Sequence, residues 1–190
     1  MSKFNENVKD LFENWNTIPN WLCFVRIALI PVFSVLFIKE QYIAAFITMI
    51  VAALTDVFDG KIARKYNLIT DFGKFMDPLA DKLLVCSAMI ALIEMNRIPS
   101  WVVIIIIARE FIISGFRLIA SDNGVVIAAS YWGKFKTTFQ MLMVIVLILN
   151  VQMPFFQILG KILTYAALIL TVVSLIDYIV KNKDVLKEQN

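Results

Sequence analysis

Residues 56–81, which read DVFDGKIARKYNLITDFGKFMDPLAD, decide the fold because they place paired carboxylates between two long apolar stretches. Asp56 and Asp59 are three positions apart, and Asp77 and Asp81 are four apart, so each pair shares one face of a helix. Carboxylates at membrane depth are costly and usually mark a functional site. Two such helices facing each other would direct four carboxylates toward one point, where a hard divalent cation would supply the counter-charge.

The composition around this stretch is that of an integral membrane protein. The chain has 190 residues, of which 60% are hydrophobic, whereas soluble domains are nearer half apolar. Several runs reach the length of about 20 apolar residues that crosses a bilayer. We therefore predict an all-α membrane protein with one six-helix domain over residues 21–190. The six transmembrane helices are expected at residues 21–38, 42–63, 71–94, 100–120, 132–149 and 155–180.

Residues 1–20 precede the first expected span and carry charges and amides where a signal peptide would be apolar, so no cleavable signal is expected. Apolar residues from Phe4 to Trp15 recur at helical spacing with polar residues between them. This pattern predicts an amphipathic helix lying on the membrane surface. A solvated tail is the alternative.

The residue inventory limits the chemistry. The chain has no histidine, which excludes mechanisms that use a histidine base, so a general base must be a carboxylate, lysine or tyrosine. Its two cysteines, Cys23 and Cys86, indicate neither a disulfide framework nor a Cys/His metal site.

Lysine and arginine placement predicts the orientation in the membrane. Lys39, Arg97 and Lys161 lie on the connections after the first, third and fifth spans, and the other 15 basic residues lie on the opposite side or in the ends of the spans that face it. Because basic residues concentrate on the cytoplasmic side, both termini and the aspartates are expected there, in a multi-pass protein of the cell membrane.

The residues between the aspartates favour phosphoryl chemistry, in which divalent ions bridge phosphate oxygens; magnesium is the default, and manganese would also fit. Gly60 and Gly73 would let a ligand approach the backbone closely, and Arg64 could bind a diphosphate through its planar fork. Thr70 is expected to cap the helix that follows it, and a helix dipole explains Asp71 in the first turn.

The spacing of eight residues resembles the signature of the CDP-alcohol phosphotransferases. These residues are Asp56, Asp59, Gly60, Ala63, Arg64, Gly73, Asp77 and Asp81. The resemblance implies six helices around a site with two metal ions, a homodimer, and CMP and a phosphodiester as products.

The same resemblance implies a role for each position. Asp56, Asp59 and Asp77 would bind the first metal ion, and Asp77 would bridge to the second. Asp81 would contact the second ion and act as the general base on the acceptor hydroxyl. The CDP-binding residues would be Gly60, Ala63, Arg64, Thr70 and Gly73.

A second set of charges interrupts the apolar stretch of residues 100–120. Arg109 and Arg117 lie about two turns apart on one helix face, beside Glu110. Arginines inside an apolar helix are rare unless they are paired or bind a ligand. Arg109 could pair with an aspartate of the site or with residues near Glu110. The alternative is a basic site for the phosphate of a phosphorylated acceptor, with the candidates Arg26, Arg109, Arg117, Lys134 and Lys136.

The flanks of the signature are similar to the phosphatidylglycerophosphate synthase branch of the family, apart from Cys23, where that branch commonly has threonine. The matching stretches are Ile18-Pro19-Asn20 with Arg26, Leu29-Ile30-Pro31, Ala108-Arg109-Glu110-Phe111 with Arg117-Leu118, and Gly133-Lys134 with Lys136-Thr137. This resemblance implies transfer of the phosphatidyl group from CDP-diacylglycerol to sn-glycerol 3-phosphate, with membrane lipids rather than nucleic acid as partners.

Three alternatives stay open from the sequence. Another acceptor could be used, namely inositol phosphate, phosphatidylglycerol or serine. A divalent-cation transporter would need polar groups across the bilayer midplane, where this chain is almost purely apolar. A non-catalytic scaffold should lack part of the aspartate set, which is complete here.

Overall fold

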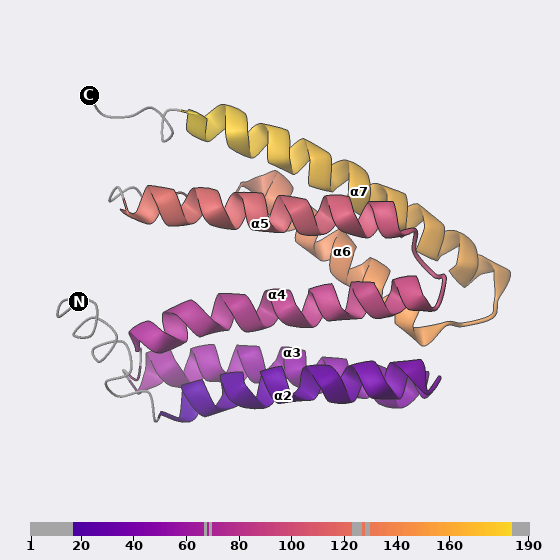
Figure 1. Cartoon of the computed structure of the whole chain (residues 1–190), viewed down its shortest axis with the longest axis horizontal. Coiled ribbons are helices and arrows are strands. Elements are labelled where there is room, and N and C mark those ends of the chain that lie inside the picture. The colour runs from indigo at the N-terminus through magenta and orange to yellow at the C-terminus, as the bar shows by residue number, and fades with distance from the viewer. Residues whose placement is uncertain (1–16, 67, 69, 123–126, 128–129, 184–190) are drawn as a thin grey trace, which may run out of the picture. The chain divides into compact units, whose positions relative to one another are not determined.

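The computed structural model describes residues 17–66, 68, 70–122, 127 and 130–183, and all regular secondary structure in these residues is helical. The helices are α2 (Ile18–Ile38), α3 (Tyr42–Lys65), α4 (Asp71–Glu94), α5 (Ser100–Asp122), α6 (Tyr131–Leu149) and α7 (Pro154–Asn182) (Figure 1). Within these helices, a few side chains lie outside the description: Val57, Asp59, Arg64, Asp71, Lys74, Phe75, Ser121 and Asp122.

The chain divides into two compact units, which are described separately. The N-terminal unit, Met1–Ala91, contains α2, α3 and most of α4. The C-terminal unit, Leu92–Asn190, contains the end of α4 and all of α5, α6 and α7. The predicted N-terminal surface helix falls mainly on residues 1–16, which lie outside the described residues.

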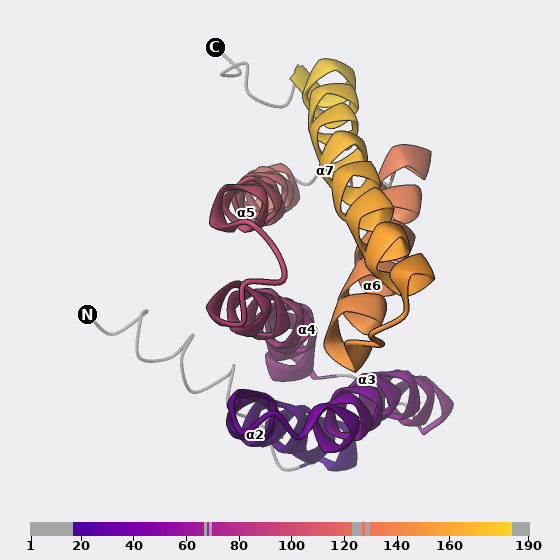
Figure 2. The same cartoon turned by 90° about the vertical axis from the view of Figure 1, so that its right-hand side faces the viewer.

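In the N-terminal unit, α2 and α3 pack side by side along their length (Figure 2). Phe33 and Phe37 of α2 are fully buried and stack on each other, and Phe37 also meets Tyr42 of α3 edge to face. Small or flexible α3 residues, including Ala45 and Met49, fill the other side of this contact. Phe24 and Phe72, with ring centroids 5.8 Å apart, bring the start of α4 against α2.

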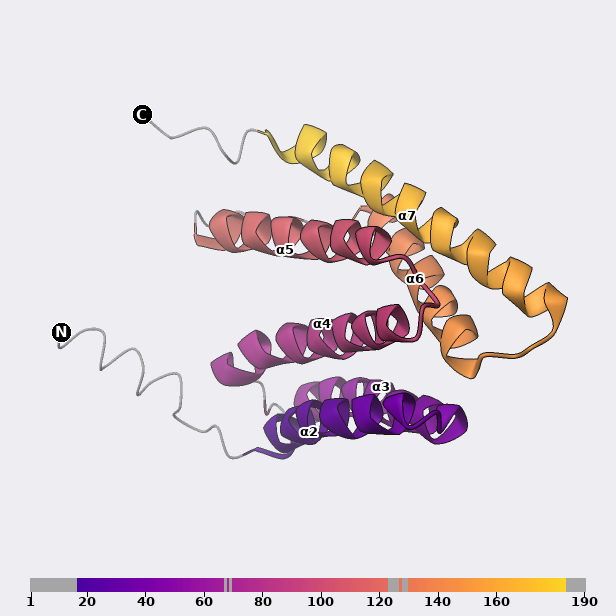
Figure 3. The same cartoon turned by 45° about the vertical axis from the view of Figure 1, so that its right-hand side comes forward.

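In the C-terminal unit, α7 packs against both α6 and α5 (Figure 3). Buried apolar residues form this core, among them Met143 and Ile148 of α6 and Ala167 of α7. The opposite face of α7 presents large apolar side chains to the exterior, as expected for a helix that contacts lipid. These exposed residues include Ile158, Ile162, Ile169 and Ile176.

The local sequence explains where the helices end. Pro19 favours a first helical turn, so α2 begins at Ile18, three residues before the predicted start. Asn150 adopts a left-handed conformation (φ 47°) at the end of α6, which asparagine tolerates better than most residues. Ser130 caps the start of α6 by accepting a hydrogen bond from the Gly133 amide.

The six predicted helical segments are confirmed as helices, and α4 has the predicted bounds. By length and composition, four of the described helices can cross a membrane, namely α2, α3, α6 and α7. The other two, α4 and α5, carry charged residues within their length, so the count of six spans stays a prediction. The chain is thus a helical protein with several membrane-crossing segments.

Candidate functional site

The aspartates lie where α3 ends and α4 begins, in the N-terminal unit. The last turn of α3 closes with a hydrogen bond from the Tyr66 amide to the Ile62 carbonyl. The first turn of α4 is capped by Thr70, whose hydroxyl accepts a hydrogen bond of 3.0 Å from the Gly73 amide. The predicted role of Thr70 as a helix cap is confirmed, and this connection sets both aspartate-bearing segments at one end of the unit.

One arginine joins two of the four aspartates. Arg26 Nη1 of α2 lies 3.2 Å from Asp56 Oδ1 of α3 and 3.0 Å from Asp81 Oδ1 of α4. The Arg26 side chain is 0% exposed, whereas Asp56 and Asp81 are 39% and 47% exposed. Two carboxylates from different helices therefore converge on one buried cation and remain open to the exterior. Arg26 was predicted to be an acceptor-phosphate residue, but its side chain pairs with Asp56 and Asp81.

The side chain of Asp77 is described by the structure, whereas that of Asp59 is not. Asp77 is half-buried, and its Oδ1 atom is buried without a hydrogen-bond donor among the described residues. The Asp59 backbone belongs to α3, but its side chain lies outside the description. Among the side chains that the structure does describe, no group of three or more His, Cys, Asp or Glu residues is gathered closely enough to hold a metal ion.

The donor chemistry of this site nevertheless fits a divalent cation. Carboxylate oxygens are the ligands that magnesium prefers. A buried carboxylate oxygen without a donor, such as Asp77 Oδ1, is costly unless a cation or a proton compensates it. Arg26 supplies only one positive charge to the two carboxylates of Asp56 and Asp81, so this group keeps one net negative charge when both are ionised.

Asn20, which was not among the predicted site residues, lies at the same end of the unit, beside Thr70. It is fully buried and exchanges hydrogen bonds of 3.1 Å with the Thr70 hydroxyl, donating through Nδ2 and accepting at Oδ1. A Cβ atom on Gly73 would lie only 2.8 Å from Asn20 Oδ1. Gly73 is therefore required for the close approach of α2 to the start of α4.

The remaining predicted CDP-binding residues lie on the last turns of α3. Gly60 and Ala63 are half-buried there, and the Arg64 side chain lies outside the description. With Thr70 and Gly73 at the start of α4, these positions flank the α3–α4 connection within one unit.

The C-terminal unit contains a separate, largely buried charge cluster. Arg109 Nε donates a hydrogen bond of 3.1 Å to Ser174 Oγ, and Arg109 Nη1 lies 3.2 Å from Glu110 Oε1. Lys136 Nζ donates to the same Glu110 oxygen. Arg109 and Lys136 are buried, so one carboxylate holds two buried cations. We call Arg109, Glu110, Lys136 and Ser174 the Glu110 cluster.

The other two predicted acceptor-phosphate residues of this unit are exposed. The Arg117 guanidinium lies 6.0 Å from the ring centre of Tyr178, and Lys134 Nζ lies 5.5 Å from that of Tyr131. Arg109 and Lys136 thus both form ion pairs with Glu110. Among the described residues, Arg117 and Lys134 instead contact aromatic rings. Glu110 and Ser174 were not among the predicted site residues. Glu110 could have been predicted from its position beside Arg109 in an apolar stretch. No feature of the sequence pointed to Ser174.

Known proteins resemble this chain over most of its length. The model of the CDP-alcohol phosphatidyltransferase family matches residues 16–173. The chain is 40% identical, over 91% of its length and 98% of the relative, to the CDP-diacylglycerol–glycerol-3-phosphate 3-phosphatidyltransferase of Bacillus subtilis (strain 168). It is 38% identical to the protein of that name from Rickettsia typhi, over 83% of this chain and 92% of the relative. It is 39% identical to the protein of the same name from Haemophilus influenzae, over 85% of this chain and 91% of the relative.

The matched region contains the aspartates of α3 and α4, Arg26 of α2 and the Glu110 cluster apart from Ser174, which lies one residue beyond it. The family model matches most of the chain, and the relatives are of similar length. The assignment to a family therefore does not depend on any single residue. The chain belongs to the CDP-alcohol phosphatidyltransferase family.

Proposed function

We propose that the protein transfers the phosphatidyl group from CDP-diacylglycerol to sn-glycerol 3-phosphate, giving phosphatidylglycerol phosphate and CMP in phospholipid biosynthesis. The observation that carries this proposal is the near-complete alignment with relatives that bear the name of this enzyme, at 37–40% identity. The convergence of Asp56 and Asp81 on one position supports it independently.

Asp56, Asp59, Asp77 and Asp81 are proposed to hold two divalent cations, with magnesium as the default and manganese as the alternative. When bound, such ions would stabilise the negative charge that develops on the phosphate during transfer. The carboxylate oxygens support this assignment, and so does the buried Asp77 Oδ1 atom, which has no hydrogen-bond donor among the described residues. Gly60, Ala63, Arg64, Thr70 and Gly73 are proposed to bind the CDP moiety beside them.

Asp81 is proposed to act as the general base. Its carboxylate is held by Arg26 but is 47% exposed, so a substrate hydroxyl can reach it. Asp81 would accept the proton of the 1-hydroxyl of glycerol 3-phosphate, and that oxygen would bond to the β-phosphorus of CDP-diacylglycerol. The bond from this phosphorus to the CMP oxygen would break, and CMP would leave.

The Glu110 cluster is proposed to bind the phosphate of the acceptor, with Arg117 and Lys134 as further cations nearby in the same unit. Arg109 and Lys136 share a single carboxylate, so the group retains one net positive charge. Burial strengthens its attraction for a phosphate dianion. Ser174 and Glu110 fix the guanidinium of Arg109 in place.

We further propose a homodimer in the cell membrane, with both termini and the aspartates on the cytoplasmic side. The distribution of lysine and arginine over the connections supports this orientation. The acyl chains of the lipid substrate would then stay in the bilayer while water-soluble glycerol 3-phosphate arrives from the cytoplasm.

The deciding experiment is CMP release by the purified full-length protein in mixed micelles with CDP-diacylglycerol and magnesium. Glycerol 3-phosphate, serine, inositol phosphate and phosphatidylglycerol are supplied in parallel. Release with glycerol 3-phosphate alone, abolished by EDTA and restored by magnesium, is expected. Release with another acceptor would overturn the acceptor assignment, and release that resists EDTA would overturn the metal assignment.

A further inference from the structure

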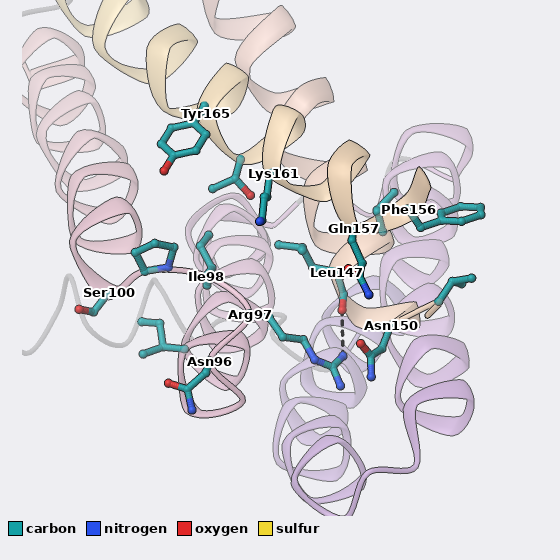
Figure 4. Close-up of a pocket in the computed structure, with 15 residues that line it drawn as sticks. Asn96, Arg97, Ile98, Ser100, Leu147, Asn150, Phe156, Gln157, Lys161 and Tyr165 are labelled. Carbon is teal, nitrogen blue, oxygen red and sulfur yellow. Dashed lines mark hydrogen bonds between the residues drawn. The ribbon is translucent and has the colours of Figure 1, made fainter. Parts of the chain in front are cut away.

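The C-terminal unit contains a cavity of about 720 Å³ that is not part of the Glu110 cluster (Figure 4). It lies where the α4–α5 connection, the end of α6 and the first turns of α7 meet. None of the aspartates of α3 and α4 lines it. Its principal polar lining residues are Asn96, Arg97, Asn150, Gln157, Lys161 and Tyr165.

The charges that line this cavity are all positive. Arg97 and Lys161 line it, and no aspartate or glutamate does. Arg97 Nη1 donates to the carbonyl oxygens of Leu147 (2.9 Å) and Ile148 (3.2 Å), so this cation is fixed at the end of α6. Lys161 is exposed and forms no ion pair with the described residues. A concave surface with two cations and no acid attracts an anion.

The uncharged polar groups suit the same ligand. Figure 4 shows Gln157 and Lys161 of α7 on one side of the cavity and Arg97 and Asn150 below them. The side-chain amides of Gln157 and Asn150 can donate hydrogen bonds to phosphate oxygens. Gln157 also lies in the first turn of α7, where the helix dipole adds partial positive charge.

The apolar surroundings favour a lipid over a soluble anion. Phe156, Val146 and Val151 line the cavity together with the cations. Lys161 and Tyr165 lie on the α7 face that also carries exposed Ile158 and Ile162. An amphiphile could place its phosphate at Lys161 and its chains along this apolar face.

The predicted orientation adds an independent argument. Of the 18 lysines and arginines, only Lys39, Arg97 and Lys161 are predicted to lie on the outer side of the membrane. Two of these three line one cavity. We propose that this cavity binds the headgroup phosphate of an anionic phospholipid. The site does not depend on the transfer reaction proposed above.

The test measures lipid retention by the full-length protein using native mass spectrometry in detergent, with phosphatidylglycerol and phosphatidylcholine as probes. Lys161→Gln is expected to weaken phosphatidylglycerol binding about fivefold, the effect of one basic residue at an anionic headgroup. Lys161→Arg keeps the charge and should bind as the wild type does. Lys39→Gln is the matched control because it removes another exposed cation on the same predicted side, at the end of α2 and outside this cavity.

Phosphatidylcholine binding should be the same in all four proteins. Equal phosphatidylglycerol binding by the wild type and Lys161→Gln would overturn the proposal. Inorganic phosphate serves as the soluble probe: its binding, lost in Lys161→Gln while lipid binding is unchanged, would overturn the assignment to a lipid. CMP release by Lys161→Gln should equal that of the wild type, which also reports that the variant is folded.

Discussion

Arg26 is the residue on which the aspartate site depends in this structure. Its guanidinium is buried between Asp56 and Asp81, and no other cation is recorded within ion-pair distance of these two carboxylates in the described residues. Removing one partner of a fully buried pair costs about 3–5 kcal/mol. Because both carboxylates are more than a third exposed, water offsets part of that cost here.

For Arg26→Gln we expect the free energy of unfolding to fall by roughly 1–2 kcal/mol without divalent ions, because the two carboxylates lose their shared partner. Magnesium should reduce this loss, since the proposed ions would supply the missing charge. Thermal unfolding in detergent, with and without magnesium, measures both effects. The same loss in both conditions would count against a metal site at these carboxylates.

Asp81 should affect turnover rather than binding. Replacing it by asparagine removes the proposed base, and we expect kcat to fall by about 10²–10⁴ while CDP-diacylglycerol still binds. Asp71→Asn is the matched control, since Asp71 lies on the same helix but outside the signature. CMP release and CDP-diacylglycerol binding give the two readouts. Full activity of Asp81→Asn would exclude this role.

Glu110 should influence binding of the acceptor indirectly, because it holds Arg109 and Lys136, the proposed phosphate-binding cations. In Glu110→Gln the net positive charge rises, but Arg109 and Lys136 lose the carboxylate that orients them toward one point. Because the loss of orientation should outweigh the gain in charge, we expect KM for glycerol 3-phosphate to rise about tenfold. KM for CDP-diacylglycerol should change much less, and Glu110→Asp should recover part of the loss. Steady-state kinetics with each substrate varied in turn would show this split. An equal rise in both KM values would indicate a general structural role.

At the scale of the helices, close packing at the start of α4 explains why residue 73 is a glycine. The Asn20–Thr70 pair fills the space where a side chain would project. Residues that are 50 positions apart in sequence make this contact, so local patterns could not reveal it. The ends of the helices were predictable, because proline, threonine and asparagine punctuate the apolar stretches.

Gly73→Ala should therefore destabilise the protein by about 1–3 kcal/mol, the usual cost of overpacking. Gly115→Ala is the control within α5, because a Cβ there would meet nothing within 4 Å and should cost nothing. Thermal unfolding of both variants in the same detergent measures the difference. If Gly73→Ala were as stable as Gly115→Ala, the contact with Asn20 would not be tight.

At the scale of the whole molecule, the sequence predicted the family and the paired aspartates, but not how the charges are neutralised. The aspartate spacing fixes which residues share a helix face, yet the pairing with Arg26 required the packing of α2 on α3. Glu110 reaches Lys136, and Ser174 reaches Arg109, only through contacts across helices, whereas the contact of Glu110 with Arg109 is between sequence neighbours. Because the family consists of transferases, the chain is an enzyme, and the cation-transporter alternative loses its support.

The proposed orientation predicts the labelling of single cysteines. In a protein with Cys23 and Cys86 replaced by alanine, a cysteine at position 183 should react with an impermeant maleimide only in inverted vesicles. A cysteine at position 39 should react only in intact cells. Labelling of both positions from the same side would contradict the odd number of spans between them.

The burial of Arg26 also bears on how the protein is made. An arginine inside an otherwise apolar segment opposes insertion by about 2.5–3.5 kcal/mol at the centre of a bilayer-spanning helix. Asp56, the nearer of its partners in sequence, arrives on α3, directly after α2 leaves the ribosome. We therefore expect α2 and α3 to leave the translocon together as a hairpin, since only the pair can enter lipid with that charge already compensated.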